Sequence, residues 1–202
     1  MKALLMISRL IDAVNERVGK WVIWLVLAAV VISAGNAIIR KTLNISSNAF
    51  LELQWYLFSG IFLLCAGYTL MRNEHVRIDV ATAWMSPKAR TWIDIFGTLF
   101  FLLPMAFIFI YLSWPVFVRT FTHGEISTNA GGLAIWPARL LVPIGFTLLA
   151  AQGISELIKR IAFLAGRGPD PLAGHGESHA AEKELAEEIR KLAEAKLAEE
   201  RK

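Results

Sequence analysis

The sequence predicts an all-α membrane protein with four transmembrane helices, and three observations support this fold class. Four apolar stretches are each long enough to cross a bilayer, which takes about 20 residues at ~1.5 Å rise per residue. They comprise residues 21–39, 50–71, 92–118 and 135–158. Hydrophobic residues make up 55% of the 202 residues, a larger share than soluble domains carry. Most of the seven tryptophans lie near the ends of the stretches, where amphipathic rings sit at headgroup depth.

The few ionisable residues inside these stretches lie toward their ends. They are Glu52, Asp94, Arg139 and Glu156. A charge at the centre of a bilayer costs at least ~2.5 kcal/mol and usually marks the path of an ion or substrate. Because the centres of all four stretches are uncharged, we expect that this chain does not translocate a solute by itself.

The short loops between the stretches differ in their content of lysine and arginine. Eleven basic residues flank the stretches on one side, and three (Arg40, Lys41 and Arg119) flank them on the other. Basic loops stay in the cytoplasm during membrane insertion. The sequence therefore predicts that both termini and the loop between the second and third spans are cytoplasmic.

An amphipathic segment precedes the first span. Apolar residues recur every three or four positions, at Leu4, Ile7, Ile11, Val14 and Val18. Polar residues share the other face, at Arg9, Asp12, Asn15 and Glu16. This period predicts an interfacial helix on the cytoplasmic leaflet. The alternative is a helical extension of the first span into the cytosol.

Prolines modify the last two spans. The third stretch would be about 40 Å long as a helix, which exceeds a ~30 Å hydrocarbon core and implies a tilt or kink. Pro104 predicts a kink near its middle, and Pro115 predicts a break near its end. Pro137 fits the opening turn of the fourth span, and Pro143 predicts a bend in it.

The composition changes after Gly166. Residues 166–171 read Gly-Arg-Gly-Pro-Asp-Pro, which is typical of a linker, and Ala, Glu, Lys and Leu dominate from Ala180 onward. We therefore divide the chain into a four-helix membrane domain, residues 1–165, and a linker with a charged, helical, cytoplasmic tail, residues 166–202.

Catalytic and cofactor sites are not expected. The four histidines lie outside the spans, so a haem bound between helices would lack axial ligands. The single cysteine, Cys65, and the lack of a glycine-rich phosphate loop or a Ser-His-Asp set argue against metal and enzymatic chemistry. The basic residues bracket apolar spans, which argues against nucleic-acid binding.

Two polar segments stand out from this apolar background. Residues 72–79 read Arg-Asn-Glu-His-Val-Arg-Ile-Asp and directly follow the second span. Residues 124–132 read Gly-Glu-Ile-Ser-Thr-Asn-Ala-Gly-Gly and precede the fourth span. Taken alone, each segment is better explained as a solvated loop.

In order along four spans, these segments carry several short motifs. They are His75-Val76-Arg77-Ile78-Asp79, Gly124-Glu125-Ile126-Ser127, Trp136-Pro137 and Pro143-Ile144-Gly145, together with Glu52 at the start of the second span. This combination resembles the small permease subunit of the tripartite ATP-independent periplasmic (TRAP) transporters. The resemblance covers roughly residues 8–165.

The resemblance implies an accessory role in a three-part system of the bacterial inner membrane. In that family, a periplasmic solute-binding protein delivers a solute, commonly an organic acid, and a large permease subunit binds it with sodium ions. The expected partners are therefore the large permease subunit, the binding protein through the assembled complex, and membrane lipids. No cofactor is expected in this chain. Two alternatives stay open: a self-sufficient small transporter, and a membrane-anchored adaptor that acts through its tail.

The candidate site residues are expected to contact a partner or to hold the structure together. They are Glu52, Arg72, His75, Arg77, Asp79, Glu125, Ser127 and Arg139. We expect Glu52 in a first helical turn, where the helix dipole stabilises a carboxylate. Arg139 gains nothing from that dipole, so it is expected to pair with Glu52, Glu125, an anionic lipid or a carboxylate of the large subunit. Residues 72–79 are expected to form a docking or folding element, in which Asp79 caps a short helix.

Overall fold

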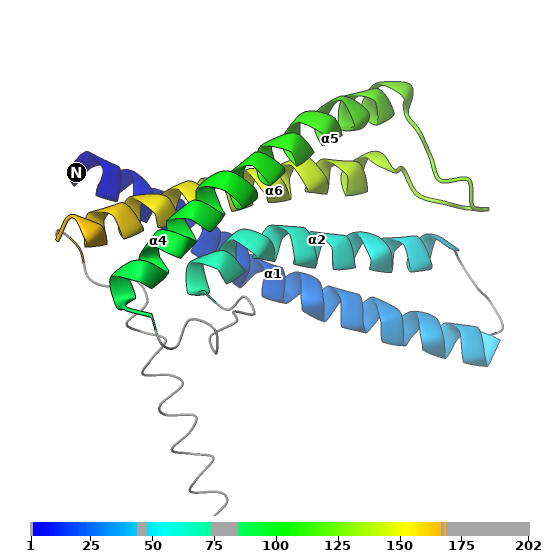
Figure 1. The fold of residues 1–202 in the computed structure, drawn as a ribbon. Coiled ribbons are helices and arrows are strands. Elements are labelled where there is room, and N and C mark those ends of the chain that lie inside the picture. Colours follow the sequence, from blue (N-terminus) through cyan, green and yellow to red (C-terminus); the bar gives the residue numbers. More distant parts are fainter. Residues whose placement is uncertain (1, 44–47, 74–84, 167, 169–202) are drawn as a thin grey trace, which may run out of the picture. The chain divides into compact units, whose positions relative to one another are not determined.

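The computed structural model describes residues 2–43, 48–73, 85–166 and 168, and its regular elements are helices. They are α1 (Lys2–Leu43), α2 (Asn48–Arg72), α4 (Pro87–Gly97), η1 (Thr98–Leu102), α5 (Leu103–His123) and α6 (Trp136–Leu164). α4, η1 and α5 follow one another without a break, so the elements form four long helical rods (Figure 1). All four are long and apolar enough to cross a membrane, which confirms the prediction of an all-helical fold with four such helices.

The first helix is much longer than its span. α1 has 42 residues, or about 63 Å at ~1.5 Å per residue, roughly twice the ~30 Å hydrocarbon core. The amphipathic segment before the first span is therefore continuous with it, and the described residues show no separate interfacial helix. The polar face of this amphipathic segment does not point uniformly to solvent. Ser8 and Asn15 are buried, while Leu4, Ile7 and Leu10 are exposed.

A π-helical turn accommodates the proline in the third rod. η1 ends two residues before Pro104, and the Leu103 N–H donates to the carbonyl of Thr98, five residues back. This wider turn is a usual way to relieve the clash and lost hydrogen bond that proline causes in a helix. Pro115 does not end the rod as expected. α5 continues through it to His123, and Gly124 ends the helix with φ at 60°.

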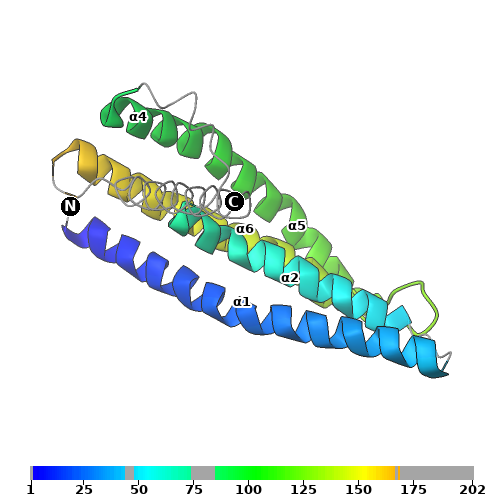
Figure 2. The ribbon, with the colours of Figure 1, turned by 90° about the horizontal axis from the view of Figure 1, so that it is seen from below.

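α2 lies alongside the later part of α1 (Figures 1 and 2). Glycines permit their close approach: a β-carbon on Gly19 would overlap the ring of Tyr68, and one on Gly60 would touch Leu25 and Leu141. Small residues at helix interfaces are the usual means by which membrane helices pack. Gly145 of α6 likewise packs directly against the backbone of Leu63 in α2.

α5 and α6 pack through a small apolar core. Leu103, Ala106 and Ala150 form its buried centre, and the rings of Phe109 and Phe146 stack with centroids 4.5 Å apart. The outer surface is apolar too: Phe58 and Phe62 on α2 are 74% and 75% exposed. Large apolar side chains outside and polar ones inside suit a chain whose surroundings are lipid.

The chain divides into two units, Met1–Lys159 and Arg160–Lys202. The clusters described below lie wholly within the first unit. The division falls a few residues before the boundary at residues 165 and 166 that the composition predicts. The predicted linker and charged tail lie almost entirely outside the described residues.

Candidate functional site

A short antiparallel pairing of backbone segments shapes the loop between α5 and α6. Ile126 and Ala134 form an isolated antiparallel bridge, in which the Ser127 N–H donates to the Leu133 carbonyl at 2.9 Å. Two glycines make the turns: Gly124 has φ at 60° and Gly131 at 71°. A β-carbon at either position would strain the backbone. The polar segment 124–132 is therefore an ordered hairpin-like loop.

Glu52 of α2 binds this loop through its carboxylate. Its carboxylate accepts hydrogen bonds from the Ser127 hydroxyl, from Asn129 Nδ2 at 2.8 Å and from the Leu133 backbone N–H at 2.7 Å. Hydrogen bonds to an ionised carboxylate are roughly twice as strong as neutral ones. Glu52 is the fifth residue of α2, beyond the first turn, so the expected position in a first turn was wrong. Its carboxylate binds the loop instead.

Two more residues of α2 contact the same loop from the same face. Asn48 Nδ2 donates to the Ala130 carbonyl at 3.2 Å, and the Tyr56 hydroxyl donates to the Ala134 carbonyl at 3.2 Å. With Glu52, these residues recur every four positions, which places them on one side of the helix. The start of α2 thus holds both strands of the loop.

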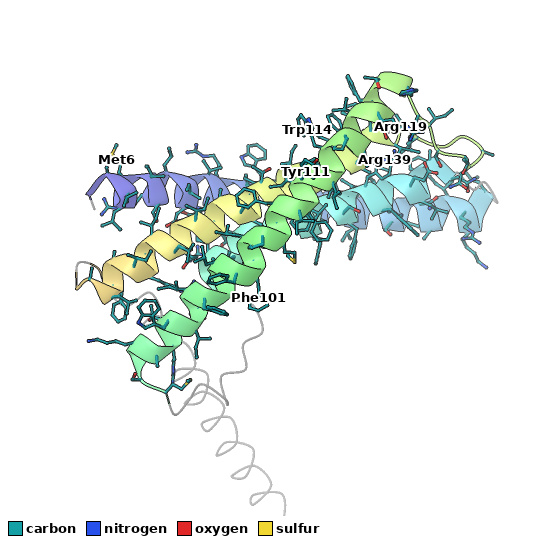
Figure 3. All side chains as sticks on the ribbon, turned by 45° about the horizontal axis from the view of Figure 1, so that its top comes forward. Met6, Phe101, Tyr111, Trp114, Arg119 and Arg139 are labelled. Atoms are coloured by element: carbon teal, nitrogen blue, oxygen red, sulfur yellow. The ribbon has the colours of Figure 1, made fainter. Side chains whose placement is uncertain are left out.

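A second group of polar residues joins the two ends of the loop. Arg139, in the first turns of α6, donates from Nη1 to Glu125 Oε2 at 2.9 Å and also to the hydroxyl of Thr120. Thr120, near the end of α5, is fully buried. Arg119 adds a longer contact to Glu125, at 3.8 Å, and Figure 3 shows Arg119 and Arg139 at the same end of the helices. Of the predicted partners, Glu125 is therefore the one that the structure gives Arg139.

A larger polar cluster joins α1 to α6 at the opposite end of α1. Ser8 and Ser155 share a hydrogen bond of 2.7 Å between their hydroxyls. Asn15 Nδ2 donates to Gln152 Oε1 at 2.9 Å, and Gln152 Nε2 donates to Asp12 Oδ1 at 2.8 Å. Because several of these groups are buried, leaving one unpaired would cost about 1–3 kcal/mol.

Lysine and two carboxylates complete this α1–α6 cluster. Lys159 lies 3.3 Å from Asp12 Oδ2 and also forms an ion pair with Glu156. The Glu156 side chain is 1% exposed, whereas Lys159 and Asp12 are each 27% exposed. Gln152 Nε2 also donates to both carboxylates, at 2.8 Å to Asp12 Oδ1 and at 3.3 Å to Glu156 Oε1. A buried acid is thus paired within the chain.

The charged groups at the loop and between α1 and α6 are engaged by other groups of the chain. The carboxylates at the loop accept hydrogen bonds from the chain's own groups. Within the described residues, no group of three or more His, Cys, Asp or Glu side chains could hold a metal ion. The arrangement fixes helices and a loop in place.

Comparison with protein families identifies the chain. The family described as "Tripartite ATP-independent periplasmic transporters, DctQ component" matches residues 29–163. The chain belongs to this family. It is therefore a multi-pass membrane component of a TRAP transporter, and not an enzyme. No curated protein and no solved structure matches it.

The match to the DctQ component covers both loop-binding groups and the α6 half of the α1–α6 cluster. It begins at residue 29, later than the resemblance over residues 8–165 suggested. Ser8, Asp12 and Asn15, which supply the α1 half, precede it.

The structure brings together four of the candidate site residues of this DctQ component. Glu125 and Ser127 belong to the loop, Glu52 binds Ser127, and Arg139 binds Glu125. Arg72 lies elsewhere, at the end of α2, where its guanidinium stacks over the Tyr68 ring at 5.3 Å from the centroid. Its Nη2 also lies 3.9 Å from Glu16. His75, Arg77 and Asp79 lie outside the described residues.

The α1–α6 cluster was missed by sequence reasoning, although a signal existed. Polar residues recur at helical spacing within the last span: Gln152, Ser155, Glu156 and Lys159. Ser8, Asp12 and Asn15 recur in the same way along α1. Two polar stripes on otherwise apolar membrane helices predict that the helices face each other.

Proposed function

We propose that this chain is the accessory, scaffolding subunit that supports the large permease subunit of its TRAP transporter. The whole system would take up an organic acid or a similar solute, delivered by a periplasmic binding protein and driven by a sodium gradient. The observation that carries this proposal is the absence of Asp, Glu, Lys, Arg and His from residues 21–39, 53–71, 95–118 and 140–155. A transporter that acted alone would normally place a carboxylate there to bind a cation or proton.

The pairing of the charges that flank these stretches supports the same proposal. Glu52, Glu125 and Arg139 are engaged by the loop, and Glu156 and Lys159 by each other and by α1. Charges used to fix helices are not available to carry an ion through repeated binding and release. The clusters therefore favour a rigid support over a moving transport element.

The scaffold proposal is tested by reconstitution into vesicles with a sodium gradient. We expect no solute or sodium flux with this chain alone, and flux when the large subunit and the loaded binding protein are also present. Flux with this chain alone would contradict the proposal and favour the self-sufficient transporter. An unchanged rate for the large subunit without this chain would contradict the supporting role, and would favour an adaptor that acts through the tail.

We also propose that both termini lie in the cytoplasm and that the loop 124–135 lies in the periplasm. The eleven-to-three bias of basic residues supports this orientation. Cys65 is the sole cysteine, so a Cys65→Ser chain gives a clean background. In intact cells, an impermeant maleimide should label Ala130→Cys but not Met85→Cys. The reverse pattern would invert the topology.

In this orientation, the two groups of candidate residues would serve opposite faces of the membrane. We propose that Glu52, Glu125, Ser127 and Arg139 shape the periplasmic loop for contact with the partner subunits. We propose that Arg72, His75, Arg77 and Asp79 form a cytoplasmic docking or folding element. Asp79→Ala should lower the yield of intact complex, and unchanged yield and transport would remove this second assignment.

A further inference from the structure

A groove of about 710 Å³ lies between α1 and α2, in the half of α1 nearer to the loop. On α1 its lining extends from Val26 to Ser33, and on α2 from Gln54 to Phe62. Most of these residues are apolar. The polar lining residues are Ser33, Gln54 and Ser59. Ser33 and Gln54 lie at the same end of the groove.

A second, polar hollow of about 470 Å³ continues the groove at that end. It shares Ser33 and Gln54 with the groove and adds Asn36, Arg40 and Lys41. The two basic residues occupy the last turn of α1, where the carbonyl end of the helix dipole favours cations. Within the described part of the chain, neither has an acidic partner at ion-pair distance. An apolar groove thus ends at an uncompensated pair of positive charges.

We propose that this composite groove binds one anionic phospholipid. Its acyl chain would lie against Val26, Val30 and Phe62, and its phosphate would lie against Arg40 and Lys41. The groove is apolar along most of its length and basic at one end, just as a phospholipid is apolar along its acyl chains and charged at its headgroup. Juxtamembrane basic residues attract anionic headgroups, and apolar helix surfaces accept acyl chains.

The length of the composite groove matches one leaflet. Val26 and Arg40 are 14 residues apart on α1, or about 21 Å at ~1.5 Å per residue. Half of a bilayer, from its midplane to its headgroups, measures about 20–22 Å. A lipid anchored at Arg40 would therefore place the end of its acyl chain beside Val26.

Hydrogen-bond donors at the junction favour a lipid over a partner helix. The side chains of Ser33 and Gln54 have no hydrogen-bond partner among the described residues, and both lie where the ester groups of a glycerolipid would fall. Ester carbonyls only accept hydrogen bonds, so a hydroxyl and an amide NH₂ suit them. A helix from a partner has its backbone carbonyls engaged internally and would leave these donors poorly satisfied.

The test uses the full chain in phosphatidylcholine nanodiscs that contain a trace of photoreactive lipid. One probe is phosphatidylglycerol with a diazirine in the middle of an acyl chain, and the other is phosphatidylcholine with the same chain. Mass spectrometry of the peptides then measures labelling in residues 26–33 and 54–62. Attraction by two basic groups should make labelling by the anionic probe about thirtyfold stronger than labelling by the zwitterionic one.

The variant Arg40→Gln/Lys41→Gln should lower labelling by the anionic probe to the phosphatidylcholine level. Unchanged labelling by the phosphatidylcholine probe would show that the groove is still formed in this variant. The matched control Arg9→Gln/Arg17→Gln removes two charges from the other end of α1 and should keep the preference. Equal labelling by both probes, or a preference that survives in Arg40→Gln/Lys41→Gln, would overturn the proposal. So would labelling of the chain alone that disappears in the complex with the large subunit, because protein would then fill the groove.

Discussion

The side-chain oxygen of Asn15 lies against Gly67, in the space that a β-carbon on that glycine would occupy. This oxygen is buried and has no hydrogen-bond donor, while the nitrogen of the same amide bonds to Gln152 and to the Ile11 carbonyl. The glycine thus makes room for a polar group that holds α1 to α6. A single contact thereby couples the packing of α1 on α2 to the α1–α6 cluster.

Gly67→Ala should therefore destabilise the protein. The new methyl group must displace Asn15 or separate the helices, and overpacking of this kind costs about 1–3 kcal/mol. The measurement is thermal unfolding of the purified chain in detergent. Gly35→Ala is the matched control, because nothing lies within 4 Å of a β-carbon at that position. Equal melting temperatures for both variants would contradict the proposed packing.

Lys159→Met should also destabilise the chain, because it removes the ammonium group that pairs with both Asp12 and the buried Glu156. Breaking a buried ion pair from one side costs about 3 kcal/mol. Adding Glu156→Gln to this variant should restore much of the stability. Lys20→Met is the control, since its ion pair with Glu16 is exposed and should change stability little. Failure of the second substitution to rescue the first would argue against a charge effect.

Glu52→Gln should loosen the loop between α5 and α6. The amide keeps the shape of the carboxylate but presents a donor where Ser127, Asn129 and the Leu133 N–H all donate. Limited proteolysis within residues 124–135 should then proceed faster than in the parent chain. Glu16→Gln, which removes an acid from α1 far from the loop, should leave the cleavage rate unchanged. Equal cleavage in all three chains would mean that other contacts hold the loop.

Arg139→Ala should weaken assembly with the large subunit more than it alters the choice of solute. Among the residues that the structure describes, Glu125 would then keep only the longer contact to Arg119 and the hydroxyl of Thr120. A double-mutant cycle with Glu125→Gln should show a coupling of about 1 kcal/mol, because the pair is only partly buried. Complex yield and uptake of competing solutes are the two readouts. A changed solute preference with normal yield would contradict this assignment.

The tail should be dispensable for transport. A chain that ends at Ala165 lacks the Gly-Pro linker and the charged segment, which has too few large apolar residues to bury a core of its own. We expect it to assemble and to support solute uptake with the complete system. Lost uptake at normal membrane levels would make the tail a functional contact and would favour the adaptor alternative.

The sequence predicted the four membrane helices well, because apolar length is a strong and local signal. It also identified Glu125 as one possible partner of Arg139. Helix ends were less predictable: Pro115 is tolerated inside α5, and Glu52 lies beyond the first turn of α2. The end of α5 and the start of α2 cannot be predicted from the neighbouring sequence alone. A helix ends where its terminal backbone groups find hydrogen-bond partners outside the helix.

The interior contacts were the hardest to predict. Asp12 and Asn15 look like a solvent-facing stripe when α1 is considered alone, and only α6 reveals that they face protein. A membrane environment reverses the usual expectation that apolar faces point inward. Pairing the stripe on α1 with the stripe at Gln152 and Glu156 would have required knowing which helices are neighbours.

The hydrogen bonds between the first and last helices also constrain how the chain is made. They join residues 137 to 147 positions apart, so α1 leaves the ribosome long before its polar partners exist. At roughly 5–20 residues per second, the delay is about seven to thirty seconds. During that interval Asp12 and Asn15 must stay hydrated at the membrane surface. The nascent first helix can therefore settle to its final depth only after α6 has been synthesised.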